Sequence, residues 1–140
     1  MKRKTISDYT LFVEAWTYLS IVKLLIVFFP FKKIALLIGK SQEETAKEPI
    51  VDTRISVIEI SIIRAVKYAL FTSKCYDQAL AITLMFKRRR IPSTIYFGLC
   101  KENEKLFAHA WVRCGDKIVS GKLGYERFTP VAWFGSNILR

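Results

Sequence analysis

The stretch TSKCYDQALAITLMFKRRRIP (72–92) has the features of one complete helix. Thr72 or Ser73 can cap its N-terminus, and Asp77 suits the positive end of the helix dipole. Pro92 ends the pattern, because the residue before a proline is disfavoured in helical geometry. We therefore predict a helix over most of this stretch.

The middle of this predicted helix, Ala79–Phe86, is apolar on nearly every side. Such a pattern is typical of a helix that is buried on several sides. The basic run Lys87–Arg90 follows and suits the negative end of the helix dipole. No aromatic stacking pattern accompanies the run, so it indicates a solvated helix end rather than a nucleic-acid site. Nucleic acid is not an expected partner.

The chain changes its period after this helix. STIYFGLC (93–100) and LFAHAWVRC (106–114) are rich in β-branched and aromatic residues, and the polar KENEK between them predicts a hairpin loop. A second tight turn at 115–116 leads into KIVSG (117–121), and a further strand is expected within 125–134. These segments predict an antiparallel meander.

Before the central helix, apolar residues recur at helical spacing from Ile55 onward and predict a helix of about four turns. The preceding segment 40–54 is polar and contains Pro49, so it indicates a linker or an exposed loop. Segment 19–39 is very apolar and predicts two short helices broken near Pro30. These helices are expected to pack on the body of the protein or to lie along a membrane surface.

Helices followed by an antiparallel sheet indicate the α+β class. We expect residues 1–49 to form an N-terminal apolar helical segment with its linker, and residues 50–140 to form the core. The longest uninterrupted apolar run, 24–31, is well short of the roughly 18 residues of a spanning helix. No small-residue cleavage site follows it, so a signal peptide is not expected.

Composition narrows the class of protein further. Lysine and arginine outnumber the acids 23 to 12, which gives a formal net charge of +11 and favours acidic or anionic partners. The three cysteines have no regular spacing, which argues against a disulfide framework and fits a reducing, cytoplasmic setting. A single histidine cannot build a histidine-rich metal site, so no metal is expected.

The only histidine, His109, raises the question of which cysteine it could activate. Side chains alternate along a strand, so Cys114 should point to the opposite face from His109. A symmetric hairpin closed by residues 101–105 would pair Phe97 with His109 and place Cys100 on the far face as well. A β-bulge could reverse either assignment.

Cys75 remains, and its predicted position is chemically favourable. Unpaired N–H groups and the dipole at the start of a helix stabilise a thiolate. A histidine on the adjoining sheet could deprotonate the thiol and later protonate a leaving amine. The backbone N–H of Cys75 could help to stabilise an oxyanion. An inert buried cysteine and a core histidine are the alternative explanation.

The segments SKCYDQALAITLMFKRRRIPSTIYFGLC, FAHAWVRCGDKIVSG and YERFTPV, in this order, resemble the leader peptidases of lasso-peptide biosynthesis. These are transglutaminase-like proteins of the papain-type cysteine-protease superfamily. The similarity covers roughly residues 55–134, and the N-terminal apolar helices also resemble those of the family. It implies a transglutaminase-like core in which the nucleophile opens a helix.

The resemblance implies that Cys75 is the nucleophile and that His109 is the general base and acid. The third member of the family's triad is an aspartate, which would fall at Gly121. Either a dyad therefore suffices, or Ser120, a backbone carbonyl or another carboxylate orients the imidazole. Asp116 is the nearest downstream acid, but a turn places it in solvent.

The resemblance also implies a function and its partners. This chain would be the stand-alone peptidase form, which removes the leader from a precursor peptide with a separate leader-recognition protein and a macrolactam cyclase. No metal or organic cofactor is required. Association with a membrane surface or an exporter would be compatible with its positive charge and apolar helices. The alternatives are acyl transfer to an amine, as in a transglutaminase, and a non-catalytic binding module of the same fold.

Overall fold

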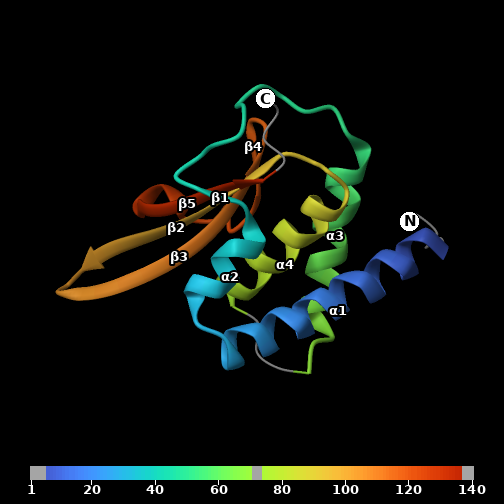
Figure 1. Ribbon diagram of the computed structural model, residues 1–140, viewed down its shortest axis with the longest axis horizontal. Coiled ribbons are helices and arrows are strands. Elements are labelled where there is room, and N and C mark those ends of the chain that lie inside the picture. The colour runs from blue at the N-terminus through green and yellow to red at the C-terminus, as the bar shows by residue number, and fades with distance from the viewer. Residues whose placement is uncertain (1–5, 71–73, 137–140) are drawn as a thin grey trace.

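The computed structural model describes residues 6–70 and 74–136, which form a group of helices packed on one face of an antiparallel sheet (Figure 1). The sheet order is β1-β5-β2-β3-β4, and the predicted α+β class is confirmed. The elements are α1 (Ile6–Phe28), α2 (Phe31–Ile38), β1 (Lys40–Ser41), α3 (Thr53–Lys67), α4 (Cys75–Arg88), β2 (Ser93–Glu102), β3 (Lys105–Cys114), β4 (Lys117–Ser120), the 3-10 turn η1 (Tyr125–Arg127) and β5 (Thr129–Ser136).

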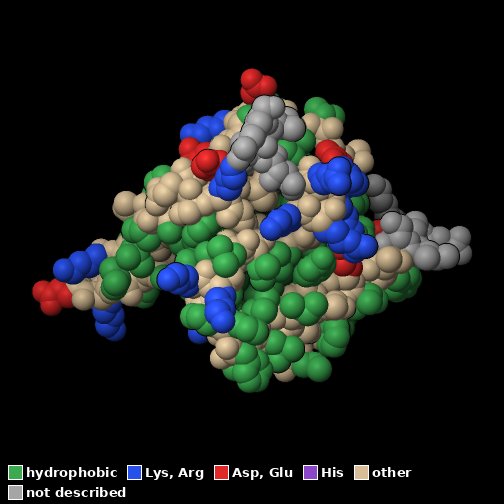
Figure 2. Space-filling model, viewed as in Figure 1, with side chains coloured by type: hydrophobic (Ala, Val, Ile, Leu, Met, Phe, Trp, Pro, Cys, Tyr) green, Lys and Arg blue, Asp and Glu red, His purple; other side chains and the backbone are tan. Residues whose placement is uncertain are grey.

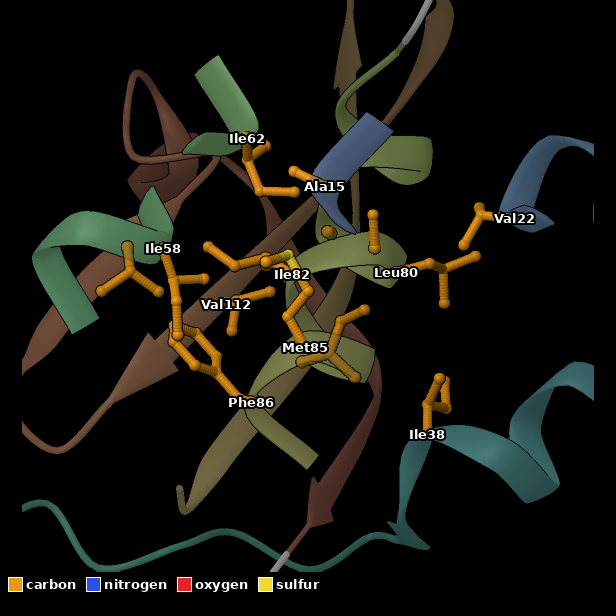
Figure 3. Close-up of a cluster of buried hydrophobic side chains, with 14 of the residues drawn as sticks. Ala15, Val22, Ile38, Ile58, Ile62, Leu80, Ile82, Met85, Phe86 and Val112 are labelled. Carbon is orange, nitrogen blue, oxygen red and sulfur yellow. The ribbon is translucent and has the colours of Figure 1, made fainter. Parts of the chain in front are cut away.

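Helix α4 lies between the sheet and α1, as predicted for a helix that is apolar on several sides (Figure 1). Figure 3 shows its core residues meeting side chains from α1, α2, α3 and β3. Leu80, Met85 and Phe86 of α4 are at most 1% exposed. The residues that meet them in the core include Ala15, Leu19, Val22, Ile38, Ile58, Ile62 and Val112.

Helix α1 packs antiparallel to α4, and ion pairs join the two helices at both ends. Glu14 binds Arg88 and Arg89 near the end of α4, with Nη1 of Arg88 2.8 Å from Oε1 of Glu14. Lys23 lies 3.7 Å from Asp77 at the start of α4. A break near Pro30 is confirmed, but the segment before it belongs to a single helix of 23 residues rather than to a short one.

Most of the segment 40–54, predicted to be a linker or an exposed loop, is exposed and lies outside helices and strands, but its first two residues form a strand. Lys40 and Ser41 pair with Gly135 and Phe134 as an edge strand of the sheet. Thr45 is buried, and its backbone N–H donates to Oγ1 of Thr94 at 2.9 Å. The segment therefore crosses from the helices to the sheet and is bound there.

The predicted register of the β2–β3 hairpin is also wrong. The turn contains only Asn103 and Glu104, both with positive φ, which is the geometry of a tight two-residue hairpin. His109 consequently pairs with Gly98 rather than with Phe97, and Cys100 pairs with Phe107. Paired residues share a face of the sheet, so Cys100 lies on the same face as His109. The reason given for excluding Cys100 therefore fails.

The two faces of β3 have different environments. Ala110, Val112 and Cys114 belong to the core that packs against α4, so the predicted separation of Cys114 from His109 is confirmed. Trp111 and Arg113 alternate with them and point to the other face. There Trp111 stacks on Tyr96 at 5.5 Å, and Arg113 donates to the Tyr96 hydroxyl at 3.0 Å.

Candidate active site

Cys75 is the first residue of α4, as the sequence predicted for a nucleophile at a helix N-terminus. The first turn is secured by Asp77, which is 3% exposed and accepts the backbone N–H of Lys74 at 2.9 Å. Lys23 of α1 contributes the ion pair to the same carboxylate. Thr72 and Ser73, the expected N-caps, lie outside the described residues. The Asp77 carboxylate therefore holds the first turn, and with it the backbone of Cys75, in place.

His109 is oriented by a backbone group. Its Nε2 lies 2.7 Å from the carbonyl oxygen of Gly121. A carbonyl oxygen only accepts hydrogen bonds, so Nε2 carries a proton and donates it. In the neutral ring, Nδ1 then remains as the basic nitrogen. Phe128 and Trp111 flank the imidazole, with ring centroids 4.9 Å and 5.9 Å away.

Gly121 reaches this position because it has no side chain. Its φ is +69°, and a Cβ at this position would lie 2.3 Å from the carbonyl oxygen of Ala110. A register shift between Val112 and Arg113 precedes it in the β3–β4 pairing. The close backbone approach directs the Gly121 carbonyl at the imidazole. Of the orienting groups considered from the sequence, the backbone carbonyl is the one that the structure brings to His109.

Ser120 and Asp116 are placed elsewhere. Ser120 pairs with Val112 in the β3–β4 ladder, and Asp116 lies in the exposed turn that begins β4. Neither side chain hydrogen bonds to His109 in the part of the chain that the structure describes. Their predicted role as orienting residues is therefore without a supporting contact.

A cavity of about 600 Å³ is lined by both Cys75 and His109. Its walls are largely apolar and aromatic, with Phe31 from α2, Tyr76 from α4 and Phe97 from β2. Burial, together with the charge of Asp77, raises the pKa of the Tyr76 phenol, so this hydroxyl stays protonated near neutral pH. The remaining lining residues are Lys74, Gly98, Leu99, Ala108, Ala110, Val131 and Ala132.

The structure brings the two predicted residues to one cavity without joining them. No hydrogen bond links Cys75 to His109, and both residues are among those described. His109 alternates with Ala108 and Ala110, so its ring is directed toward the Trp111 face of the sheet. The residues of β3 that pack against α4 lie on the opposite face, so a thiol–imidazole contact requires a local change of the β3 backbone that brings the imidazole to the α4 face.

The other two cysteines differ in their surroundings. Cys114 is 2% exposed, and burial raises the pKa of its thiol to about 12. Its thiol is therefore protonated and inaccessible at neutral pH. Cys100 is partly exposed, and its thiol donates a hydrogen bond of 3.8 Å to Oε1 of Glu102. Neither cysteine lies at a helix N-terminus.

The aromatic support of the imidazole was missed from the sequence. Gly98 lies opposite His109, and a Cβ there would lie 2.7 Å from the Trp111 ring and 3.0 Å from Phe128. The glycine thus makes room for the two rings that flank His109. A glycine inside a strand often marks such a close approach, and this signal was available in STIYFGLC.

Comparison of the sequence with known proteins gives a match to one protein family. A family model described as the transglutaminase-like superfamily matches residues 19–132. The match begins within α1 and ends within β5, so it includes Cys75, His109 and Gly121. No curated protein and no solved structure gives a significant match.

Proposed function

The chain belongs to the transglutaminase-like superfamily, which includes cysteine peptidases and acyltransferases, and we propose that it is a cysteine peptidase. The observation that carries the proposal is the cavity that Cys75 and His109 both line. His109 Nε2 bonds to the Gly121 carbonyl. This bond leaves Nδ1 as the basic nitrogen of a residue that lines the same cavity as Cys75.

In the proposed reaction, the Cys75 sulfur attacks the carbonyl carbon of the scissile peptide bond while His109 holds the thiol proton. The backbone N–H of Cys75 stabilises the oxyanion at the helix N-terminus. His109 then protonates the departing amine, and the C–N bond breaks to leave a thioester. Water, deprotonated by His109, hydrolyses the thioester and restores the free thiol.

We further propose that the substrate is a lasso-peptide precursor, from which the enzyme removes the leader. Support comes from the segments around Cys75, Gly98 and His109, which resemble the family of leader peptidases, whereas Gly121 departs from the family's aspartate. A separate leader-recognition protein would deliver the precursor, and a macrolactam cyclase would consume the amine that cleavage releases. The net charge of +11 favours acidic segments in these partners.

The test is reconstitution with the leader-recognition protein and a matching precursor, followed by mass spectrometry of the products. We expect wild type to cleave the precursor once, and Cys75→Ala and His109→Ala to be inactive. Cys100→Ala and Cys114→Ala are matched controls that should retain cleavage. Cleavage by Cys75→Ala would reject the proposal, and loss of activity only in Cys100→Ala would identify Cys100 as the nucleophile.

The same spectra distinguish the two alternative functions. A peptidase yields a free carboxylate at the leader's new C-terminus, whereas an acyltransferase yields an amide with an added amine. Binding of the precursor without any product would indicate a non-catalytic module.

A further inference from the structure

Helix α1 exposes an apolar stripe along the side that faces away from α4. The stripe recurs at helical spacing, which places its members on one face. Phe28, at its end, is 72% exposed. On the opposite face, Ala15, Leu19 and Val22 are buried in the core. The exposed apolar residues of α1 are Tyr9, Val13, Ile21, Leu24, Val27 and Phe28.

The apolar surface continues past Pro30 onto α2. Phe29, between the two helices, is exposed, and so are Leu36 and Leu37 of α2, of which Leu36 is 80% exposed. Figure 2 shows hydrophobic side chains gathered over the end of the molecule where α1 and α2 meet, with Lys or Arg side chains close to them over α2. We call these three residues and the exposed apolar residues of α1 the α1–α2 face. Single exposed hydrophobic residues are common on protein surfaces, whereas a large group of them in one place marks a binding site.

From residue 15 onward, the charged side chains along this face are all basic. No aspartate or glutamate occurs between residues 15 and 42, whereas this segment contains four lysines: Lys23, Lys32, Lys33 and Lys40. Lys32 and Lys33 are exposed and form no ion pair in the described part of the chain. Lys33 lies 6.0 Å from the Phe29 ring, so a cation borders the apolar surface directly. Exposed apolar side chains bordered by lysines complement a binding partner that offers an apolar interior and an anionic surface.

The packing of α1 indicates whether this helix could span a membrane or lie along its surface. By length and composition, Asp8–Phe28 would suffice to cross a membrane, and 17% of its most apolar window is buried. In the folded protein, however, Glu14 is paired with Arg88 and Arg89, and Lys23 with Asp77. A spanning position would carry these charges into hydrocarbon or break the pairs. A position along the interface leaves them undisturbed.

We propose that the α1–α2 face binds the surface of an anionic lipid bilayer, with α1 and α2 lying along the interface. The apolar side chains enter the headgroup boundary, and Lys32 and Lys33 contact lipid phosphates. Phe31, the first residue of α2, also lines the cavity that contains Cys75, so the bound protein holds its cavity beside the membrane. The lipid site itself does not depend on any catalytic role of Cys75.

The test is co-sedimentation of the full chain with vesicles of phosphatidylcholine, alone or mixed with phosphatidylglycerol. We expect binding to the mixed vesicles that weakens as salt rises from 50 to 500 mM, a range over which screening becomes strong. Lys32→Glu combined with Lys33→Glu should weaken binding roughly ten-fold or more. Phe28→Ser combined with Leu36→Ser should weaken it to a similar extent.

Matched controls remove charge and apolar area elsewhere. Lys101→Glu combined with Lys105→Glu alters the exposed hairpin, and Leu123→Ser removes a side chain that is 96% exposed outside the face. Both controls should bind as wild type does, and thermal melts should show that all variants are folded. Failure of wild type to sediment with anionic vesicles at 50 mM salt would overturn the proposal. The proposal would also be overturned if the control variants weakened vesicle binding equally, or if the protein self-associated through Phe28 and did not bind lipid.

Discussion

The carbonyl of Gly121 lies where the resemblance expects an aspartate side chain, and it bonds to the same residue, His109. A backbone carbonyl cannot supply a negative charge, but it fixes which ring nitrogen carries the proton. Orientation of the imidazole is therefore achieved here by main-chain geometry. The requirement at position 121 is the absence of a side chain rather than the presence of an acid.

Gly121→Ala should lower kcat with little change in KM, because the carbonyl moves away from His109. It should also destabilise the fold by about 2 kcal/mol or more, since both the positive φ and the 2.3 Å approach to Ala110 oppose a Cβ. Steady-state kinetics and thermal unfolding measure the two effects. Gly124→Ala is the matched control, because φ is +77° there but the nearest atom to its Cβ is 3.5 Å away. Equal kinetics for both variants would contradict the orienting role.

The three cysteines should differ in their reaction with iodoacetamide at neutral pH. Cys75 should be labelled fastest because it lies at a helix N-terminus and borders an open cavity. Cys114 should resist labelling until the protein unfolds, because its thiol is buried and its pKa is raised to about 12. Peptide mass spectrometry over time measures the three rates. Faster labelling of Cys100 than of Cys75 would instead favour Cys100 as the nucleophile.

Among the elements, α1 and α4 depend on each other through charges at both ends. Burial alone would raise the pKa of Glu14, but hydrogen bonds and charge from Arg89 and Arg88 outweigh this and hold its pKa below the ordinary value of 4.5. A depressed carboxyl pKa stabilises the fold at pH values above the unfolded pKa. The stabilisation is lost as pH falls through the folded pKa.

Glu14→Gln should therefore destabilise the protein by about 2 kcal/mol near neutral pH, since two arginines lose a charged partner. The difference from wild type should begin to shrink as pH falls below 4.5 and should vanish below the lower folded pKa, where the wild-type carboxyl is protonated as well. Urea unfolding at several pH values measures this. Glu126→Gln, in the exposed η1 turn, is a control that should behave as wild type does. A constant difference across this pH range would contradict the ion-pair explanation.

On the scale of the whole molecule, the core spans the boundary expected between residues 49 and 50. Ala15, Leu19 and Val22 of α1 share one cluster of buried side chains with α4 and the sheet. The bound segment around Thr45 ties the N-terminal half to Thr94 as well. We infer that residues 1–49 and residues 50–140 fold together as one unit around a common core.

Removal of residues 1–49 should consequently abolish cooperative unfolding of the remaining chain. The fragment would leave the α1-facing sides of α3 and α4 in water, together with the unpaired Arg88 and Arg89. Leu19→Ala provides a milder test in the full chain and should cost about 3 kcal/mol, because Leu19 is fully buried. Circular dichroism during thermal unfolding measures both. A sharp transition in the fragment would show instead that residues 50–140 form a folding unit of their own.

Several parts of this architecture could be predicted because their signals are local. The apolar middle of α4, the acidic residue in its first turn and the proline after it define a helix without reference to the rest of the chain. The turn at Gly115 depends on the permissive backbone of glycine, and the break at Pro30 depends on the restricted backbone of proline. Cys75 and His109 could likewise be predicted as candidate site residues, since each lies in a characteristic local segment.

The parts that failed depend on contacts between distant segments. The choice between a five-residue and a two-residue turn at Asn103 shifted the pairing by one position and moved Cys100 to the face of His109. Whether Lys40 and Ser41 pair with β5 depends on residues more than ninety positions away. Neither outcome can be derived from the propensity of the residues concerned.

The sequence by itself determined the order of the helices and of β2 to β5, the helix-opening position of Cys75 and the strand position of His109, because these follow from periodicity and backbone preference within short windows. Only the tertiary structure decided the hairpin register, the approach of the Gly121 carbonyl to His109 and the shared cavity. Each of these is a distance between segments brought together by the packing of the whole chain, and no local preference specifies it.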